Sequence, residues 1–457
     1  MEARAKVRVA VVGSGMAGLV TAYLLHRDQK QRYQVTVYEE GDQLSLDSSS
    51  ISINNSFGHV DRIDLPMRAF AGGFYNHLQA MYDYLEVHYH EQPFLFSFSE
   101  SLISKSRTEP YFIHSSNLHH FPPLRPKGTS LVGFVCRIVY LFACYIWYTI
   151  CCFFIHPRFN AKTRVSESYA EYLTRIRLPR HFVDQLLVPL MSSVTTCPHD
   201  SLLQFPAVDL VDYKKKTHGA HHFTVSNGVH MVQEKLSRGL DTRLSTSVLS
   251  VEPTELGINV TAQSHGYSSI AVDTFDRVVL AVPPNVVGKV FSPLRDQMLR
   301  IPTIEVESVV HHAGAKMGLS SSQISEKPEM ISSCRRMGQP QLIELRTSSN
   351  GTARTESAHL QPSGVTVTTC PIVSLPPEEV IQAVTFTRVL RTPESRELVN
   401  SIFDQTPREK GWRNGDDGIW LAGGWCWDGL VLLEGCEVSA MRIADAFGVE
   451  IPWRTEQ

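Results

Sequence analysis

The stretch VVGSGMAGLVTAYLL, residues 11–25, decides the fold of this chain. It follows and overlaps a β-branched run at residues 7–12, and it continues into apolar residues at helical spacing. This order predicts a strand, a tight turn and a helix. Three glycines lie in the turn, namely Gly13, Gly15 and Gly18. The first permits the sharp turn, the second lets a pyrophosphate approach the backbone, and the third lets the helix pack closely on the strand.

A second predicted strand follows the helix and ends in a carboxylate. Residues 33–38, YQVTVY, are mostly β-branched or aromatic, and Glu39 comes directly after them. A carboxylate there accepts hydrogen bonds from both ribose hydroxyls of an adenosine and repels a 2′-phosphate, so NADP is disfavoured. We expect the pyrophosphate on the free N–H groups at the helix start, around Met16 and Ala17. The alternative is a glycine turn in another α/β unit, and the order strand, turn, helix, strand, glutamate argues against it.

The composition is typical of a globular chain with a large core. The 457 residues suffice for two or three domains, and 43% of them are apolar. A net charge of −3 provides no dominant basic patch, so nucleic-acid binding is not expected. Nine cysteines without CxxC spacing are expected to be reduced, and the charged first ten residues do not resemble a secretory signal, so we expect an intracellular protein. The polar run at 345–364 is expected to be a loop outside the fold.

The strongest outlier in the sequence is the apolar run at 131–155. Its last 18 residues, 138–155, carry no charge and would form about 27 Å of helix, close to the ~30 Å hydrocarbon core of a bilayer. If both ends of the chain build one domain, a single span would separate them. We therefore expect a helix or helical hairpin that dips into one leaflet of an endomembrane. A spanning helix and a fully buried core helix are the alternatives.

Three later segments extend the opening motif. Residues 224–251 indicate a glycine-started helix followed by a strand. FDRVVLAVPP, 275–284, indicates a buried strand ended by prolines, and 418–447 indicates a strand, a glycine turn and a helix. In this order the segments resemble the flavin-containing amine oxidase and carotenoid-desaturase-like superfamily along nearly the whole chain. Residues 63–87 resemble its amine-oxidase-like branch of predicted NAD/FAD-binding proteins.

The resemblance implies an FAD-dependent oxidoreductase with an α/β fold. It implies a discontinuous Rossmann-like FAD-binding domain and an α+β substrate domain that carries the apolar helical element. The FAD-binding domain is expected from residues 1–62, 221–295 and 410–450, and the substrate domain from 63–220 and 296–409. The expected cofactor-binding residues are Gly13, Gly15, Met16, Ala17, Gly18, Glu39, Arg68, Val248, Gly424, Glu434 and Gly435.

The chain departs from the family pattern at several positions. GDQLSLDSSS, 41–50, replaces the Gly-Gly-Arg that often follows the ribose glutamate, and Arg68 is the candidate substitute cation. Gly424 replaces a residue that is often acidic. Leu432 replaces a tyrosine of the aromatic cage of amine oxidases, which counts against amine oxidation. No clear equivalent of the flavin-site lysine is found, because Lys316 fits that role poorly.

The catalytic side chains are left open, because the flavin carries the chemical step. His222 and His312 adjoin segments that the resemblance places near the flavin and are candidate general bases. Trp425 and Trp427 follow the second glycine turn and are candidates for the pocket wall, with core packing as an equal alternative. No metal site is expected, because adjacent histidines on a strand point to opposite faces. Cys426 does not match the family's usual cysteinyl-flavin position.

The sequence therefore predicts an enzyme that dehydrogenates or oxidises a hydrophobic small molecule, such as a lipid, an isoprenoid or another secondary metabolite. The apolar run at 131–155 would let such a substrate enter from a membrane surface. Amine oxidation is one alternative, and a redox-neutral flavin isomerase or low-turnover flavin-binding protein is another. A soluble NAD-dependent dehydrogenase fits residues 1–40 alone but not 418–447. The electron acceptor, O₂ or a quinone, and the oligomeric state are left open.

Overall fold

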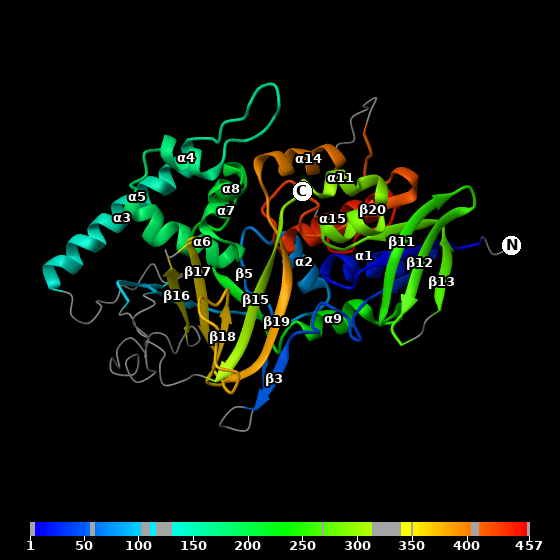
Figure 1. Ribbon diagram of the computed structural model, residues 1–457, viewed down its shortest axis with the longest axis horizontal. Coiled ribbons are helices and arrows are strands. Elements are labelled where there is room, and N and C mark those ends of the chain that lie inside the picture. Colours follow the sequence, from blue (N-terminus) through cyan, green and yellow to red (C-terminus); the bar gives the residue numbers. More distant parts are fainter. Residues whose placement is uncertain are drawn as a thin grey trace.

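The computed structural model is an elongated molecule in which a large twisted sheet separates two groups of elements (Figure 1). The glycine turn and its neighbouring strands lie on one side of this sheet, and a group of helices that includes α3 lies on the other. The structure describes residues 5–54, 60–101, 110–115, 130–266, 269–312, 340–348, 351–403 and 411–454.

A five-stranded parallel sheet gathers three distant parts of the chain. Its order is β10-β2-β1-β14-β20, and every pairing in it is parallel. Strand β1 is central, and its last four residues are buried, as expected for a strand covered on both faces. The strands are β1 (Val7–Val12), β2 (Tyr33–Tyr38), β10 (Asp241–Arg243), β14 (Arg277–Leu280) and β20 (Ile419–Leu421).

Two helices and a small antiparallel sheet complete this part of the molecule. Helix α1 (Met16–His26) connects β1 to β2 and packs against α15 (Leu433–Ala446), the helix that follows β20. The antiparallel sheet consists of β11 (Thr246–Thr254), β12 (Gly257–Ser264) and β13 (Ile270–Phe275). Helix α15 thus lies beside helix α1, so this part of the molecule is discontinuous in sequence.

The large sheet has seven strands in the order β19-β15-β18-β17-β16-β7-β8. All its pairings are antiparallel except the one between β16 and β7. The strands are β7 (Phe94–Glu100), β8 (Phe112–Ser115), β15 (Thr303–His312), β16 (Gln341–Ser348), β17 (Arg354–Leu360), β18 (Val365–Thr369) and β19 (Val380–Val389). With the helices beside it, this sheet forms the α+β part, and the predicted fold class is confirmed.

The prediction that 345–364 is a loop outside the fold is wrong. The described residues of this run supply the end of β16 and all of β17, inside the seven-stranded sheet. The polar side chains of this run can be buried because they form ion pairs and hydrogen bonds with neighbouring strands. The Glu356 carboxylate, for example, pairs with Arg346 at 2.8 Å, and His359 bonds Gln341 at 2.7 Å.

The remaining elements are short and surround the two sheets. Two small sheets consist of β3 (Ile51–Asn54) with β4 (Val60–Ile63), and of β5 (Phe70–Ala71) and β6 (Tyr89–Glu91) on either side of β9 (His222–Val225). The other helices are α2 (Asn76–Tyr84), α4 (Tyr169–Arg175), α5 (Arg180–Phe182), a π-helical turn (Val183–Leu187), α6 (Val188–Thr195), α7 (His199–Leu203), α8 (Ala207–Lys216), α9 (His230–Ser237), α10 (Pro284–Val290), α11 (Arg295–Met298) and α14 (Pro393–Phe403), with 3₁₀ turns at Ser292–Leu294 and Asp416–Gly418.

Helix α3 (Leu131–Phe154) contains most of the apolar run and lies on the surface of the molecule. Its 24 residues extend about 36 Å, and by length and composition alone it could cross a membrane. One stripe packs on the protein at α8, and it consists of Leu141, Cys144, Tyr148, Cys151 and Cys152.

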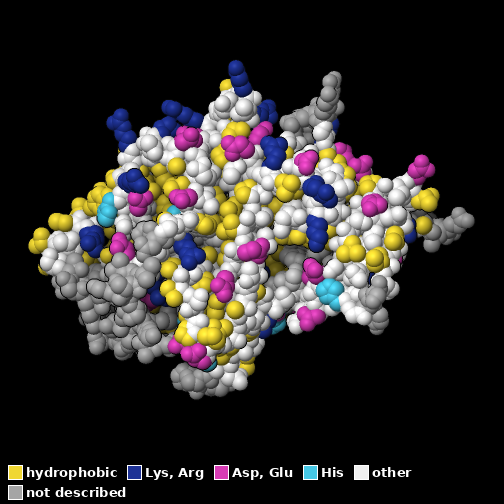
Figure 2. Space-filling view, viewed as in Figure 1, with side chains coloured by type: hydrophobic (Ala, Val, Ile, Leu, Met, Phe, Trp, Pro, Cys, Tyr) yellow, Lys and Arg dark blue, Asp and Glu magenta, His cyan; other side chains and the backbone are white. Residues whose placement is uncertain are grey.

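Most of the rest of α3 is exposed and apolar. Only 17% of its most apolar window is buried, so the alternative of a fully buried core helix does not hold. Figure 2 shows hydrophobic side chains gathered at the left end of the molecule, where α3 lies in Figure 1. The exposed apolar side chains of the helix are Leu131, Val132, Val135, Val139, Phe142, Ile146, Trp147, Ile150, Phe153 and Phe154, and we call them the apolar face of α3.

Candidate active site

A cavity of about 1030 Å³ extends from the glycine turn to the seven-stranded sheet. It is lined at one end by residues 15–17 and by the second glycine turn, 422–425. At the other end Phe94, Ile343 and Val367 face it from three strands of the large sheet. Its volume lies just above the range of about 300–1,000 Å³ that is usual for small-molecule and cofactor sites. The cavity therefore has room where a cofactor and a substrate can meet.

Gly13 and Gly18 make the close approaches that the sequence predicted, and Gly15 is open to the cavity. Gly13 has a φ of +98°, and a Cβ on it would lie 2.6 Å from the carbonyl oxygen of Ala281. A Cβ on Gly18 would lie 2.0 Å from the carbonyl oxygen of Gly13. A Cβ on Gly15 would meet no atom closer than Ser45 Oγ at 3.8 Å, and this glycine lines the cavity. Gly13 and Gly18 thus permit close packing, while Gly15 leaves the backbone open to a ligand.

The start of helix α1 is suited to an anion. No side chain caps its first turn, and Met16 and Ala17 line the cavity beside Gly15. Free N–H groups at a helix start carry a partial positive charge and commonly bind phosphate groups. This is the place where the sequence predicts a pyrophosphate.

The Glu39 carboxylate is held at the end of β2 by the glycine turn. It accepts hydrogen bonds from the backbone N–H of Ser14 at 3.0 Å and of Gly41 at 2.9 Å. The neighbouring Glu40 points elsewhere, because its carboxylate accepts a hydrogen bond from Ser247 at 3.1 Å. Of the two neighbouring carboxylates, the one that bonds the glycine turn is therefore Glu39.

Arg68 is a buried cation on the wall of the cavity. Its Nη2 donates to the carbonyl of Leu46 at 3.2 Å, but its Nε has no hydrogen-bond partner among the described residues. The nearby Asp64 carboxylate accepts the N–H of Val229 at 3.0 Å. A buried donor without a partner is costly, so a ligand with an anionic oxygen would complete this site.

The second glycine turn lies at the same end of the cavity as residues 15–17. Gly424 lines the cavity, and a Cβ on it would lie 3.0 Å from the carbonyl oxygen of Leu432. Helix α15 begins directly after Leu432, and no side chain caps its first turn. Leu433 and Cys436 of this first turn also line the cavity. Two uncapped helix starts, those of α1 and α15, therefore face the same cavity.

Two family models match this sequence. One, described as an NAD(P)-binding Rossmann-like domain, matches residues 11–85, and the other, described as a flavin containing amine oxidoreductase, matches residues 100–312. Together the two matches support a flavin amine oxidase-like FAD-dependent oxidoreductase. The resemblance that the sequence indicated, and the prediction of an FAD-dependent enzyme, are confirmed.

Solved structures share this fold at low sequence identity. Cyclohexylamine oxidase from Brevibacterium oxydans IH-35A is 11% identical with a TM-score of 0.57, and the match covers 97% of this chain and 100% of that one. A CLA-producing fatty acid isomerase from P. acnes is 12% identical with a TM-score of 0.60, and the match covers 96% of this chain and 98% of that one. No curated protein sequence matches this chain significantly.

FAD is the cofactor of this superfamily, and the residues of this chain fit it. The open backbone at Gly15 and the uncapped start of α1 suit the pyrophosphate, and the unpartnered Nε of Arg68 supplies a buried donor beside them. The uncapped start of α15 suits a polar edge of the flavin ring. Arg68 therefore remains the predicted substitute for the family arginine that GDQLSLDSSS lacks.

The departures from the amine oxidase pattern lie on the cavity wall. Leu432 lines the cavity, so the position of the family tyrosine holds an aliphatic side chain. Gly424 lines it without any side chain. Lys316 lies outside the described residues.

The two tryptophans that the sequence singled out lie in different environments. Trp425 lines the cavity, and its indole N–H donates to the carbonyl of Val282 at 3.2 Å. Trp427 turns into the core, donates to the carbonyl of Leu430 at 3.1 Å, and packs edge-on against Phe74 at 5.8 Å between ring centroids. For Trp427 the core-packing alternative therefore fits the structure.

Glu434 and Gly435 do not line the cavity. The Glu434 carboxylate accepts the backbone N–H groups of His77 at 3.0 Å and Leu78 at 3.1 Å, so it caps the start of α2. A Cβ on Gly435 would lie 2.4 Å from the indole nitrogen of Trp427, so this glycine permits close packing. Leu433 and Cys436 of this helix start line the cavity, whereas Glu434 and Gly435 face other parts of the protein.

Burial raises the pKa of Glu434 to about 7 despite its two backbone hydrogen bonds. The folded protein therefore binds this proton more tightly than the unfolded chain, whose glutamate titrates near 4.5. The stabilisation is complete below about pH 4.5 and is lost as the pH rises to about 7. We expect Glu434→Gln to reduce the fall in the free energy of unfolding across this interval by about 3 kcal/mol.

Denaturant unfolding at a series of pH values measures this difference. The exposed Glu255→Gln on the β11–β12 turn is the matched control and should leave the pH dependence of wild type unchanged. Identical pH profiles for wild type and Glu434→Gln would show that Glu434 does not titrate in this interval.

The remaining predicted residues divide between the cavity and the surface. His222 of β9 lines the cavity, and burial lowers its pKa to about 4, so the ring is neutral at physiological pH. His312 is exposed at the end of β15 and does not line the cavity. Val248 lies in β11 opposite Ala262, also outside the cavity lining. Of the two candidate bases, the structure brings only His222 to the cavity.

Several cavity residues were missed by sequence reasoning. Burial lowers the pKa of His359 to about 4, and its Nε2 bonds Gln341 Oε1 at 2.7 Å. Tyr75 and Tyr213 line the wall near the second glycine turn, and Arg388 lines it from β19. Strand alternation in TESAHLQ, 355–361, could have placed His359 on a buried face, but no local signal marks the other three.

Neither the cysteines nor the histidines form a metal site in the described part of the chain, where no cluster of three or more potential ligands occurs. His221 pairs with Glu91 at 2.6 Å, while its neighbour His222 faces the cavity. Cys426 is fully buried, does not line the cavity, and has its thiol pKa raised by burial. A thiol in this state is a poor nucleophile for flavin attachment.

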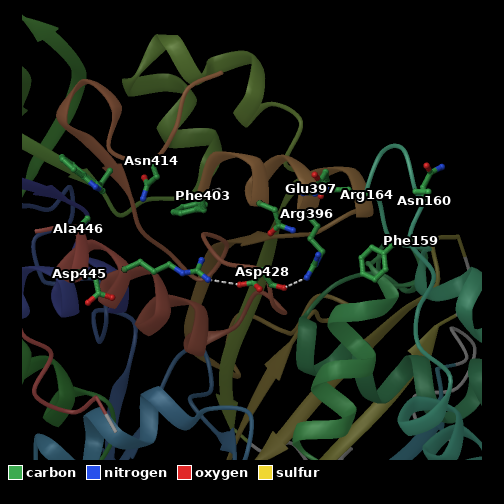
Figure 3. Close-up of a pocket in the computed structure, with 14 residues that line it drawn as sticks. Phe159, Asn160, Arg164, Arg396, Glu397, Phe403, Asn414, Asp428, Asp445 and Ala446 are labelled. Carbon is green, nitrogen blue, oxygen red and sulfur yellow. Dashed lines mark hydrogen bonds and ion pairs between the residues drawn. The ribbon is translucent and has the colours of Figure 1, made fainter. Parts of the chain in front are cut away.

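A second cavity of about 1040 Å³ lies beside α14 and α15 (Figure 3). Asp428 lies within it, with its carboxylate 3.0 Å from Arg442 and its carbonyl accepting a hydrogen bond from Arg396 at 2.6 Å. Its lining includes one ion pair, between Arg442 and Asp428, and none of the predicted cofactor residues. The cofactor motifs therefore assign the active site to the first cavity.

Proposed function

We propose that this enzyme dehydrogenates or oxidises a hydrophobic small molecule, such as a lipid, an isoprenoid or another secondary metabolite. The observation that carries the proposal is the lining of the cavity beyond the cofactor groove. Aromatic and aliphatic side chains predominate there, and apolar walls favour an apolar ligand. They are Phe70, Tyr75, Phe94, Phe96, Tyr213, Ile343, Val367 and Phe386.

The chain supplies few groups for acid–base chemistry at this site. Bound FAD supplies the hydride acceptor, so the protein has to bind the substrate, orient a C–H bond and exclude water. The ring of His222 is neutral in the cavity, and its pKa of about 4 makes it a weak base. Leu432, in place of a cage tyrosine, leaves the site without one aromatic wall that amine oxidases use, so amine oxidation is less well supported.

Anaerobic flavin reduction tests the proposed substrate class. The purified holoenzyme in mild detergent is mixed with lipids, isoprenoids or soluble amines, and loss of flavin absorbance near 450 nm is recorded. We expect reduction by an apolar substrate, and reoxidation by air or by a quinone then identifies the electron acceptor. Reduction by soluble amines alone would contradict the proposal.

A redox-neutral isomerase is the second candidate. It is favoured by one observation, that the fold is shared with a fatty acid isomerase, and it would use the same apolar cavity. The two candidates differ under anaerobic conditions. An isomerase turns over many equivalents of substrate with no net flavin reduction, whereas a dehydrogenase stops after one equivalent and leaves the flavin reduced.

We also propose that the apolar face of α3 lies in one leaflet of an endomembrane. The opposite stripe is packed on the protein, so the helix is held parallel to the molecular surface rather than free to span. Exposed basic residues follow the helix directly, at Arg158, Lys162 and Arg164, and they suit anionic lipid headgroups. A substrate dissolved in the membrane would then reach the enzyme without crossing water.

Liposome flotation tests the membrane proposal. We expect Val139→Glu, Phe142→Glu and Ile146→Glu together to lower the partition coefficient on anionic liposomes by about 100-fold, because they put three charges where apolar surface enters the lipid.

The control for this experiment places the same three charges on exposed apolar positions of the β11–β13 sheet. These positions are Leu256, Ile270 and Val272. This variant should float as wild type does. Equal flotation of both variants would show that α3 is not the membrane contact.

A further inference from the structure

Arg388 is a cation on the cavity wall for which no described residue supplies a counter-ion. It lies near the end of β19, and its Nε donates to the carbonyl of Thr195 at 2.9 Å. Its terminal nitrogens form no hydrogen bond, and no carboxylate lies within ion-pair distance, anywhere in the part of the chain that the structure describes. A guanidinium stays charged at physiological pH, so this charge is uncompensated.

The titratable groups around Arg388 do not neutralise it. They are the thiols of Cys197, Cys370 and Cys436 and the phenol of Tyr75. Burial raises the pKa of Cys197 and Cys370 to about 11 and that of Cys436 to about 12, and it also raises the pKa of Tyr75. All four groups are therefore uncharged at neutral pH, and the guanidinium is the dominant charge at this end of the cavity.

Two other arginines of this region are paired with a carboxylate, whereas Arg388 and Arg68 form no ion pair with any described residue. Arg62 pairs with Asp47 on the same cavity wall. Arg391, three residues after Arg388, donates to three backbone carbonyls and lies 3.8 Å from Asp209. The side chain of Arg388 is half-buried and lines the cavity. An unpaired charge that is partly withdrawn from bulk water is costly, and a ligand in the cavity would supply its partner.

A second unpartnered donor lies next to Arg388. The hydroxyl of Thr196 is buried and has no hydrogen-bond partner in the described structure, and Thr196 lines the cavity. This residue directly follows Thr195, whose carbonyl holds the guanidinium. The terminal nitrogens of Arg388 and the hydroxyl of Thr196 thus form no hydrogen bond with any described residue.

We propose that Arg388, assisted by Thr196, binds the carboxylate of the substrate, which is therefore an apolar molecule with a carboxylate group. A guanidinium binds a carboxylate through two parallel hydrogen bonds. The adjacent lining, Phe386 and Val389 of the same strand, is apolar and suits the rest of such a molecule. This inference rests on the proposed function, because it specifies the substrate class of the same cavity.

A carboxylate fits better than the two other anionic groups that could be considered. The pyrophosphate of FAD is expected by Gly15 and Arg68, whereas Arg388 lies near the end of β19 among Cys197, Cys370, Cys436 and Tyr75. A phosphate ester carries up to two charges at neutral pH and is usually held by more than one cation, whereas the part of the cavity around Arg388 offers one.

Ligand titration of the holoenzyme tests the assignment. Dodecanoate, dodecanol and dodecyl phosphate have the same chain with different headgroups, and their dissociation constants are measured from changes in the flavin spectrum. We expect Arg388→Met to weaken dodecanoate binding by about 10- to 100-fold and to leave dodecanol binding within about twofold. Arg388→Lys, which keeps the charge but not the fork, should give an intermediate loss.

Two further variants distinguish a loss of carboxylate binding from a nonspecific effect of substitution on the protein. Thr196→Val preserves the shape of the side chain and should weaken only dodecanoate, by about fivefold. Arg300→Met removes an exposed arginine on the surface and should change nothing. The FAD content of Arg388→Met should equal that of wild type.

The outcomes distinguish this inference from the proposed function. If dodecanol binds and dodecanoate binds no better, or if Arg388→Met affects both equally, the carboxylate assignment is wrong and the apolar cavity stands. Tighter binding of dodecyl phosphate would reassign the site to phosphate. Loss of FAD in Arg388→Met would assign Arg388 to the cofactor. If no probe binds wild type, both proposals fail.

Discussion

Gly15→Val should fold normally and lose FAD, whereas Gly18→Ala should destabilise the protein itself. Gly15 has φ −68° and ψ −178°, which any residue adopts, and its Cβ would point into open cavity. A valine there would occupy the space through which a pyrophosphate reaches the backbone. A Cβ on Gly18 would instead lie 2.0 Å from the carbonyl oxygen of Gly13, so α1 would have to move away from the strand.

The two substitutions are expected to differ in their effects on stability and on FAD binding. For the apoproteins, Gly15→Val should stay within about 0.5 kcal/mol of wild type, and Gly18→Ala should lose about 3 kcal/mol, the upper end of ordinary overpacking. Gly15→Val should bind FAD at least about tenfold more weakly. Thermal unfolding of the apoproteins and the ratio of flavin to protein absorbance measure the two effects. Apoproteins are compared because bound FAD would itself stabilise wild type.

Retention of stoichiometric FAD by Gly15→Val would contradict the placement of the pyrophosphate at the start of α1. A matched control is Gly351→Val, at a turn where a Cβ would meet no atom within 4 Å. It should retain FAD, although its φ of +79° makes some loss of stability expected. Together these variants distinguish blocked binding from damaged folding.

The opening motif was predictable from sequence because its constraints are local. The positive φ of Gly13, the close approach at Gly18 and the carboxylate after β2 each follow from residues within one strand–turn–helix–strand unit. The same reasoning was less successful at the C-terminal turn. Glu434 belongs to the expected motif, but its carboxylate faces α2, an element more than 350 residues earlier.

The cavity wall could not be predicted for the same physical reason. Arg388 is a candidate binding residue because no described carboxylate pairs with it. That spatial arrangement cannot be read from the sequence. The strands at 345–364 were misjudged because their polar residues bond each other in the interior, as Glu356 does with Arg346. A polar composition predicts an exposed segment only if the polar side chains would have no hydrogen-bond partners when buried.

Arg391→Met should cost at least about 3 kcal/mol and release FAD. The side chain of Arg391 is 2% exposed and holds the loop after the second glycine turn. It donates to the carbonyls of Trp425 at 2.6 Å, Trp427 at 2.7 Å and Gly429 at 2.7 Å. Its loss leaves three buried carbonyls without these donors and removes one of two cations beside the buried Asp209. Because Trp425 lines the cavity, movement of this loop would also disturb the cofactor.

Three further variants show which part of Arg391 matters. Arg391→Lys keeps the charge but cannot reach three carbonyls, so it should recover only part of the stability. Asp209→Asn in the Arg391→Met background removes the poorly compensated carboxylate and should recover about 1 kcal/mol or more. Arg442→Met breaks an exposed ion pair with Asp428 and should cost less than about 1 kcal/mol. If Arg391→Lys were as stable as wild type, charge alone would hold this loop, and the three carbonyl contacts would contribute nothing.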